Sequence, residues 1–166
     1  MNILELKNLS YSYDGIHPIL KDITYTFEQG KVYAIVGKSG AGKTTLLSLL
    51  SGLTEPTSGT ILFQDKDITT IDRYHYGSKY VGVVFQGFNL LPQLTAVENV
   101  ELSMDISGMK IKNRCEVAMN LLDKVELDEA KANRRVLKLS GGEQQRVAIA
   151  RRALVPVILT EKRRMR

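Results

Sequence analysis

Eight residues, Gly37-Lys38-Ser39-Gly40-Ala41-Gly42-Lys43-Thr44, have the types and the spacing of a P-loop. Glycines at these positions let successive backbone N–H groups point inward and form an anion nest. A helix that begins near Lys43 would add free N–H groups and the positive end of its dipole. The Lys43 ammonium would reach the β- and γ-phosphates, and the Thr44 hydroxyl could ligate Mg²⁺. The motif predicts binding of a nucleoside triphosphate, a property that kinases, GTPases and many ATPases share.

A second glycine-rich stretch, Leu139-Ser140-Gly141-Gly142-Glu143, opens a helix-forming segment. Ser140 as the N-cap with Glu143 three residues later is a capping box, which explains both residues without a ligand. It does not explain two consecutive glycines, because each costs about 0.5–1 kcal/mol relative to alanine in a helix. Such glycines are expected where the backbone must come close to another group, and N–H groups at a helix start suit a phosphate.

Four motifs, in order over about residues 1–154, resemble those of ATP-binding-cassette (ABC) proteins. “GKSGAGKTT” is similar to their Walker A motif, and “LSGGEQQR” to their signature motif. “VVFQGFNLLPQLTAVENVEL” resembles their Q-loop, with Gln86 as its glutamine, and “LKNLSYSYDG” resembles the opening that carries an adenine-stacking aromatic. The amino-acid sequence around the Q-loop is most similar to the sequences of the subgroup that powers lipoprotein, macrolide or peptide export.

The resemblance implies ATP and Mg²⁺ as cofactors, held between two such domains that pack head to tail. The P-loop of one domain would contribute residues 37–45, namely Gly37, Lys38, Ser39, Gly40, Ala41, Gly42, Lys43, Thr44 and Thr45. The other domain would contribute Ser140, Gly141 and Gly142 to the γ-phosphate.

The resemblance also implies roles for an aromatic and a glutamine. Tyr13 would stack on adenine; Tyr11 is the main competitor for that role, and simple packing of a strand aromatic is the alternative. Gln86 would contact Mg²⁺ or the attacking water. The helical segment would dock on a membrane permease, which implies a cytoplasmic protein at the inner face of the membrane.

The end of the chain departs from the family pattern. Hydrolysis needs one carboxylate to help hold Mg²⁺ and another to position water, and the family supplies both as an Asp-Glu pair after a buried strand. Here Thr160-Glu161 stands in that position, so Glu161 is a candidate remnant of the catalytic base. The switch histidine and the later strands of the family do not follow. This pattern favours a truncated or frameshifted chain whose hydrolysis of ATP is impaired.

The charge distribution argues against a nucleic-acid partner. The net charge is +5, but six Lys and Arg against one Glu from Arg151 onward account for it, so residues 1–150 balance at 17 and 17. A nucleic-acid-binding domain would carry its basic face within the fold. No apolar run approaches the roughly 20 residues of a membrane span. The single cysteine, Cys115, excludes an internal disulfide.

The elements that would position these residues follow from hydrophobic periodicity. Strands are predicted at residues 3–13, 18–30, 31–37 (as a buried strand), 59–64, 80–86 and 157–159. Helices are predicted at residues 43–52, 95–108 and 113–125 and from Gly141 onward. In the third of these helices, one core face would comprise Cys115, Met119, Leu122 and Val125.

These elements predict an α/β fold of the P-loop NTPase, ABC type, incomplete at the C-terminus. A single domain over residues 1–166 would comprise an N-terminal antiparallel β subdomain with the P-loop core (1–86) and a helical subdomain (87–138). The signature helix and a degenerate Walker B strand would follow (139–166). The leading function is the ATPase subunit of an ABC exporter. The alternatives are a non-hydrolysing ATP-binding fragment and a soluble ABC ATPase that works on ribosomes or DNA.

Overall fold

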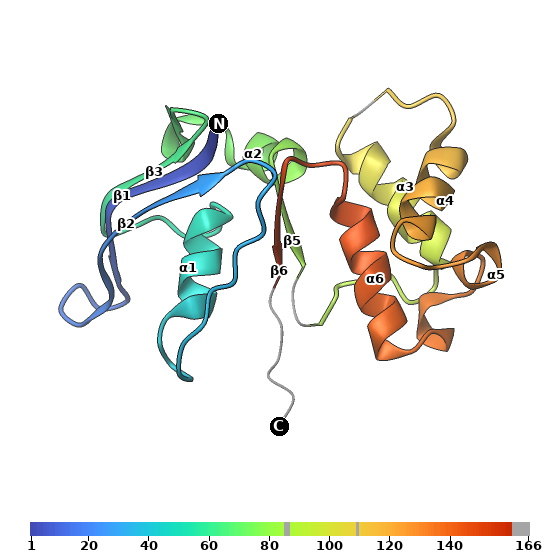
Figure 1. Ribbon diagram of the computed structural model, residues 1–166, viewed down its shortest axis with the longest axis horizontal. Helices are drawn as coiled ribbons and strands as arrows, with labels where there is room; N and C mark the ends of the chain where they lie inside the picture. Colours follow the sequence, from blue (N-terminus) through green and yellow to red (C-terminus); the bar gives the residue numbers. More distant parts are fainter. Residues whose placement is uncertain (85–86, 109, 161–166) are drawn as a thin grey trace. The chain divides into compact units, whose positions relative to one another are not determined.

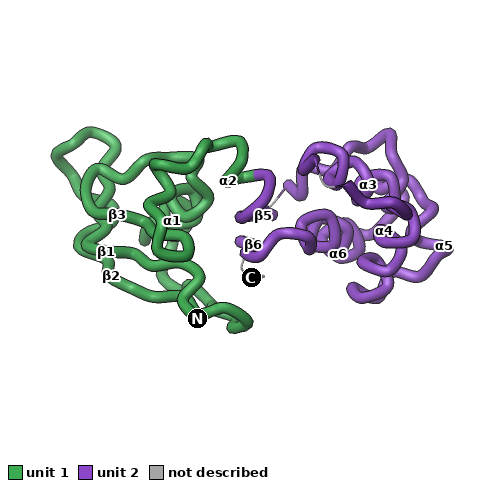
Figure 2. Tube along the Cα trace, turned by 90° about the horizontal axis from the view of Figure 1, so that it is seen from above, with its two compact units in different colours: residues 1–77 green, residues 78–166 purple. Residues whose placement is uncertain are grey.

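The computed structural model describes residues 1–84, 87–108 and 110–160. The chain divides into two compact units, residues 1–77 and residues 78–166, which Figure 2 shows in different colours. The first unit is built on an antiparallel sheet, and the second combines a cluster of helices with a two-stranded parallel sheet (Figure 1). This content confirms the predicted α/β class.

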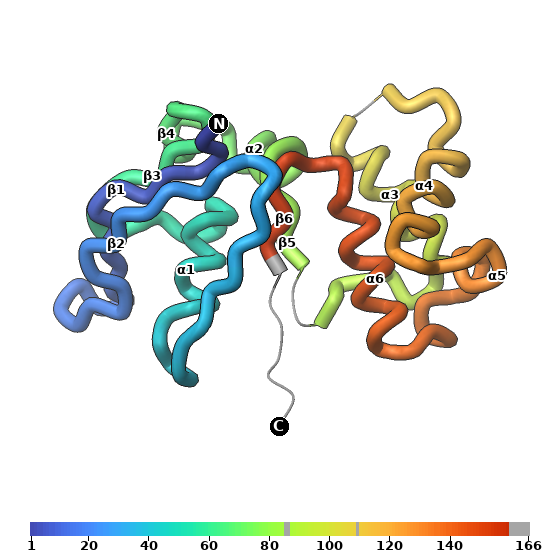
Figure 3. Tube along the Cα trace, viewed as in Figure 1, coloured from blue at the N-terminus to red at the C-terminus, as the bar shows by residue number. Residues whose placement is uncertain are grey.

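A four-stranded sheet in the order β2-β1-β3-β4 forms the base of the first unit. Its strands are β1 (Asn2–Ser12), β2 (Pro18–Glu28), β3 (Ser58–Phe63) and β4 (Lys66–Asp67). β1 pairs antiparallel with β2 on one side and with β3 on the other, so the sheet joins residues far apart in the chain (Figure 3). The predicted alternation is confirmed, because the side chains on one face of the sheet are buried, among them Leu4, Leu6, Ile61 and Phe63.

Helix α1 (Lys43–Leu50) carries the end of the P-loop motif. It stops in a Schellman motif, in which the Leu53 N–H donates to the carbonyl of Ser48 and the Gly52 N–H to that of Leu49, both over 3.0 Å. Gly52 has a φ of 70°, which glycine adopts at little cost, and this confirms the predicted helix end. The remaining short elements are η1 (Ile68–Thr70) and α2 (Arg73–Lys79), which runs past the boundary of the unit.

The predicted buried strand at residues 31–37 is wrong. These residues lie in no strand, and the Val32 and Val36 side chains are 100% and 84% exposed. The residues of this run are of types that favour a pleated, half-buried surface. They form a strand only where a neighbouring strand pairs with them. Within the described part of the chain, no strand pairs with this segment.

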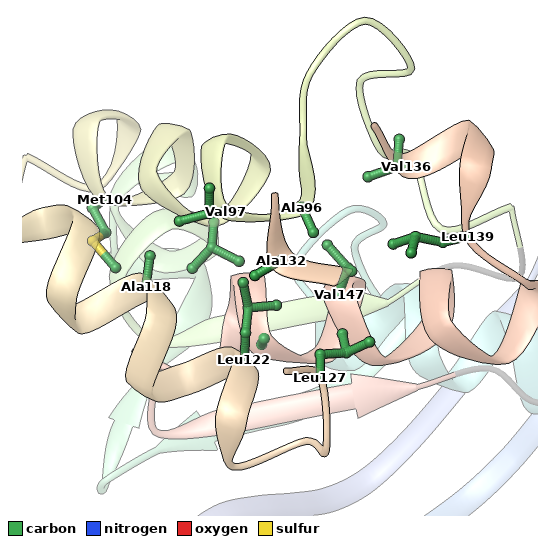
Figure 4. Packing of buried hydrophobic residues seen from close by; sticks show 12 residues of the cluster. Ala96, Val97, Met104, Ala118, Leu122, Leu127, Ala132, Val136, Leu139 and Val147 are labelled. Atoms are coloured by element: carbon green, nitrogen blue, oxygen red, sulfur yellow. The ribbon is translucent and has the colours of Figure 1, made fainter. Parts of the chain in front are cut away.

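The second unit contains α3 (Ala96–Ile106), α4 (Arg114–Asp123), α5 (Glu129–Ala132), η2 (Val136–Lys138) and α6 (Gly141–Arg152). A cluster of small and branched apolar side chains from these elements forms its core, and Figure 4 shows Val97, Leu122 and Val147 pointing toward one another. The predicted core face of α4 is confirmed for Leu122, with Met119 and Val125 partly buried. It is wrong for Cys115, which is exposed, because the buried stripe runs through Ala118 instead.

Strands β5 (Val81–Val84) and β6 (Val157–Thr160) pair in parallel, with Val81 opposite Val157 and Val84 opposite Thr160. Both were predicted as strands, and their parallel pairing is typical of an α/β fold. Gly82 allows α6 to approach β5 closely, because a β-carbon there would lie 2.8 Å from Cβ of Arg152 and 2.9 Å from Cγ2 of Val155. In the described residues, every helix is too short or too polar to cross a membrane.

Candidate functional site

The P-loop residues adopt the backbone conformation that their glycines were predicted to allow. Gly40 and Gly42 have φ angles of 79° and 77°, a region that other residues enter at a cost of about 1–2 kcal/mol. Gly42 is the N-cap of α1, and a glycine offers no side-chain oxygen to the first-turn N–H groups. The helix start therefore keeps the donors and the positive dipole end that favour an anion.

The Lys43 side chain, which is half-buried, lies against its own loop. Its Nζ donates to the carbonyl of Gly37 over 3.0 Å and to that of Lys38 over 2.7 Å. The ammonium is thus held against the backbone of the glycine-rich loop. The donor set comprises one full positive charge, backbone N–H groups and the hydroxyl of Thr44, and it fits a polyphosphate with a divalent cation.

Tyr13 follows the end of β1 and is 73% exposed, as a ring must be to stack on a ligand. Its hydroxyl lies 3.4 Å from Oγ1 of Thr45, on the first turn of α1. Tyr11 packs edge-to-face against Tyr13, with ring centroids 5.0 Å apart, so the two rings lie on one face as expected. The hydroxyl contact places Tyr13 beside the P-loop helix, which favours it over Tyr11 as the base-stacking residue.

The turn after Tyr13 is fixed by Asp14. This carboxylate accepts hydrogen bonds from the backbone N–H groups of His17 and Ile16, over 2.8 and 2.9 Å, and from the Ser12 hydroxyl over 2.8 Å. These bonds, those from His17 first, hold the pKa of Asp14 well below its usual range. Asp14 thereby orders the hairpin that carries Tyr13, and the sequence had not suggested that role.

The second glycine-rich stretch begins α6 and forms the predicted capping box. The Glu143 N–H donates to Oγ of Ser140 over 3.3 Å, and the Ser140 N–H donates to Oε2 of Glu143 over 2.8 Å. The bond from the Ser140 N–H, followed by one that the Ser140 hydroxyl donates to the same Oε2 over 3.0 Å, lowers the pKa of Glu143. Lys131 approaches the same carboxylate at 3.3 Å.

Gly141 and Gly142 are not required by the chain around them. Neither has a positive φ, and a β-carbon on either would meet no atom within 4 Å. A side chain at these positions would therefore fit this chain and would favour the helix, because glycine weakens a helix relative to alanine. Within the described residues, neither space nor backbone conformation requires glycine at these two positions. This supports the close approach of a group from outside the chain.

Two polar side chains that the sequence reasoning missed hold the segment 87–95, between β5 and α3. Arg151 on α6 donates to the carbonyl of Asn89 over 2.7 Å and to that of Phe88 over 3.2 Å. Asn99 on α3 is fully buried; it accepts from the Leu91 N–H over 2.8 Å and donates to the Leu91 carbonyl over 3.1 Å. The role of Asn99 could have been predicted, because it is a lone Asn within the apolar stripe of α3. The role of Arg151 could not, because its partner lies 62 residues away in the chain.

Two predicted site residues, Gln86 and Glu161, lie outside the described residues. Thr160 ends β6, the strand on which the resemblance expects a metal-binding Asp. Among the described residues no group of three or more His, Cys, Asp and Glu side chains could hold a metal ion by itself. The residues that the structure does place are divided between the units: Tyr13 and the P-loop in the first, Ser140, Gly141 and Gly142 in the second.

Comparison with known proteins agrees with the motifs. The family model described as ABC transporter matches residues 20–158. The chain is 36% identical to a bacterial ABC transporter cassette, solved as a dimer in a post-hydrolysis state bound to ADP and Pi. The TM-score is 0.82, over 95% of this chain and 73% of that one.

Curated relatives, each longer than this chain, show the same similarity. An ABC transporter ATP-binding protein of Bacillus subtilis is 45% identical over 152 residues, which are 91% of this chain and 67% of the relative. A methionine import ATP-binding protein of Enterococcus faecalis is 40% identical over 91% of this chain and 45% of its own length. The macrolide export ATP-binding/permease protein of Campylobacter jejuni is 39% identical over 88% and 23%. The chain thus spans two thirds or less of these relatives.

Proposed function

The chain belongs to the ABC transporter family, and we propose that it is a nucleotide-binding subunit that couples ATP to export through a membrane permease. The observation that carries the proposal is the position of Lys43. Its ammonium is held by the carbonyls of Gly37 and Lys38, at the start of a helix whose N-cap is a glycine. This arrangement supports the binding of a chain of phosphates.

Each described residue would have a distinct part in binding. Lys43 would exchange a carbonyl partner for a phosphate oxygen, and the N–H groups of residues 38–45 would surround the phosphates. The Thr44 hydroxyl would ligate Mg²⁺, while the Tyr13 ring would cover the adenine. Gly141 and Gly142 would let the start of α6 approach the γ-phosphate of ATP held by a second copy or a similar domain.

Hydrolysis by this chain would be weak. In the arrangement that the resemblance implies, an Asp at position 160 would help to hold the metal, and threonine cannot supply that charge. Binding and association driven by ATP do not need this carboxylate. ATP binding with slow turnover is therefore the expected behaviour.

The direction of transport is proposed from the segment 83–102, whose sequence resembles that of exporters. The two relatives named for import and for export are nearly equally similar to this chain, so overall identity does not favour either. The chemistry of the transported substrate has no bearing on the residues described above. The partner would be a permease that contacts the helical part of the second unit.

Binding of ATP by the purified chain, measured by equilibrium dialysis with radiolabelled ATP, tests the central proposal. We expect Lys43→Met to weaken binding by about 10–100-fold, because a charge-assisted contact contributes about 1.5–3 kcal/mol. Lys21→Met, an exposed lysine on β2, is the matched control and should bind as the unmodified chain does. Equal binding by both variants, or none by the unmodified chain, would exclude a nucleotide site at the P-loop.

Turnover and partner choice are tested separately. Phosphate release should be near background in the unmodified chain and should rise in Thr160→Asp; fast release that Lys43→Met abolishes would contradict impaired hydrolysis. Co-expression with an exporter permease of the same genome should yield a complex that co-purifies in detergent. Sedimentation with ribosomes instead would favour the soluble alternative.

A further inference from the structure

The segment 87–95 begins with a turn whose backbone conformation is disfavoured for Phe88. Phe88 and Asn89 both have left-handed backbones, with φ angles of 59° and 48°. An aromatic residue in this region is uncommon, and such conformations persist only where surrounding groups enforce them. The local bond from the Asn89 N–H to the Gly87 carbonyl, 2.7 Å, closes the turn but fixes it to nothing else.

Arg151 supplies the external restraint. Its guanidinium donates through two nitrogens to the two consecutive carbonyls of this turn, over 2.7 Å to Asn89 and 3.2 Å to Phe88. A planar fork with several donors can hold two acceptors in one orientation, which a lysine cannot reproduce. The group is more than half buried, and its Nε has no partner among the described residues, so the two bonds to the turn orient it.

The remainder of the segment is tied to the helical cluster by other means. Asn99 fixes Leu91, and the Val136 N–H donates to the Leu94 carbonyl over 3.2 Å. The Ala96 N–H donates in turn to the carbonyl of Arg134, over 3.0 Å. The segment is thus anchored at its far end to α3 and to residues 134–136, and at its near end to the last turn of α6.

α6 therefore joins two regions of interest, one at each of its ends. Its N-terminus presents Ser140, Gly141 and Gly142, and its last turn carries Arg151, about 15 Å away at 1.5 Å per residue. α6 is one uninterrupted helix from Gly141 to Arg152, so its two ends can move together.

We propose that Arg151 is a positioning residue that transmits movement of the α6 N-terminus to the segment 87–95, from which α3 begins. The inference rests on the proposed function, because it takes nucleotide as the ligand that moves α6. Its structural part, the clamp of Arg151 on the 88–89 turn, is independent of any ligand. Arg151 touches no reacting atom in this scheme and acts only through the segment that it holds.

The test compares Arg151→Met with Arg152→Met by hydrogen–deuterium exchange of the purified chain, with and without ATP. Arg152 is a matched control: it is the next residue of α6, is buried to a similar degree, and donates to neither carbonyl of the turn within the described residues. Its aliphatic carbons pack over Gly82, and methionine would largely retain that contact. Arg151→Lys tests the need for a fork.

Without ATP, we expect Arg151→Met to raise exchange at residues 89–91 about 10-fold, and Arg152→Met to leave it unchanged. With ATP, the unmodified chain should gain protection at both 140–146 and 87–95. Arg151→Met should keep the first gain and lose the second, Arg152→Met should keep both, and Arg151→Lys should recover only part of the second. A purely structural role for Arg151 would raise exchange without separating the two gains.

Three results have distinct meanings. Equal exchange in the two methionine variants without ATP would overturn the clamp. A gain at 87–95 that survives in Arg151→Met would overturn the transmission and leave the clamp in place. No response to ATP at 140–146 in the unmodified chain would overturn the transmission, and if the P-loop also gave none the result would contradict the proposed function; the ATP-free comparison would still decide the clamp.

Discussion

A β-carbon on Gly42 would lie 2.8 Å from Cδ2 of Leu20, closer than real β-carbons approach another atom. Gly42 also has a left-handed backbone, so both space and conformation require glycine there. We expect Gly42→Ala to destabilise the chain by at least about 2 kcal/mol, combining left-handed strain with local overpacking. ATP binding should weaken as well, because the start of α1 would shift. Urea denaturation and ATP titration measure the two effects.

Gly40→Ala is the matched control for this prediction. Gly40 has nearly the same φ, 79°, but a β-carbon on it would meet no atom within 4 Å. Only the conformational cost of about 1 kcal/mol is expected. If the two alanine variants were equally stable, contact with Leu20 would not be the reason for glycine at position 42.

Tyr13 should contribute to the affinity for ATP through its ring. Stacking on a base is worth about 1–3 kcal/mol, so Tyr13→Ala should weaken ATP binding about 5–100-fold and leave binding of inorganic triphosphate unchanged. Tyr13→Phe loses only the hydroxyl contact with Thr45 and should bind ATP nearly as well as the unmodified chain. A selective loss of ATP affinity in Tyr11→Ala instead would assign the stacking role to Tyr11.

The sequence predicts local features of this site better than distant ones. The capping box of Ser140 and Glu143, the end of α1 at Gly52 and the strand alternation of β1 are all decided within a few residues, and each is confirmed. The predicted strand at residues 31–37 depends on a neighbour that composition cannot supply. For the same reason, no local pattern predicts that Arg151 bonds to the turn at Asn89.

Gly82 should be intolerant of any side chain. A β-carbon there would lie within 3 Å of Arg152 and Val155, and the first of these contacts is with Cβ, which cannot swing away. We expect Gly82→Val to force α6 from β5 and to cost about 1–3 kcal/mol or more. Gly77→Val is the control, since a β-carbon at Gly77 would meet nothing within 4 Å. It should leave stability unchanged or raise it slightly, because valine favours a helix more than glycine does, and thermal unfolding of both variants can verify the difference.

The capping boxes predict a loss of stability in acid. Hydrogen bonds from the backbones and hydroxyls of Thr95 and Ser140 lower the pKa of Glu98 and Glu143 from the ordinary 4.5 in the folded chain. A carboxyl with a depressed pKa stabilises the fold above its unfolded pKa, and the contribution is lost as the pH falls through the folded value. These groups should therefore cause no change of melting temperature with pH between pH 6 and 7, where their contribution is fully present, and should lower the melting temperature below about pH 4.5.

Glu143→Gln isolates one of these contributions. A glutamine can still accept the Ser140 N–H bond but carries no charge to titrate. Its melting temperature should lie below that of the unmodified chain at pH 7 and converge with it in acid. A constant difference at all pH values would mean that the Glu143 charge does not contribute through its pKa.

Gly141 and Gly142 allow stability and function to be separated. Because a β-carbon on either meets nothing and neither has a positive φ, Gly141→Ala and Gly142→Ala should each stabilise the chain by about 0.5–1 kcal/mol. If the glycines serve close approach to a nucleotide held by a second domain, the same variants should lose association driven by ATP, while ATP binding at their own P-loops is retained. Sedimentation velocity with and without ATP, beside thermal unfolding, distinguishes the two effects. Variants that are more stable and still associate with ATP would show that these glycines have no part in a shared nucleotide site.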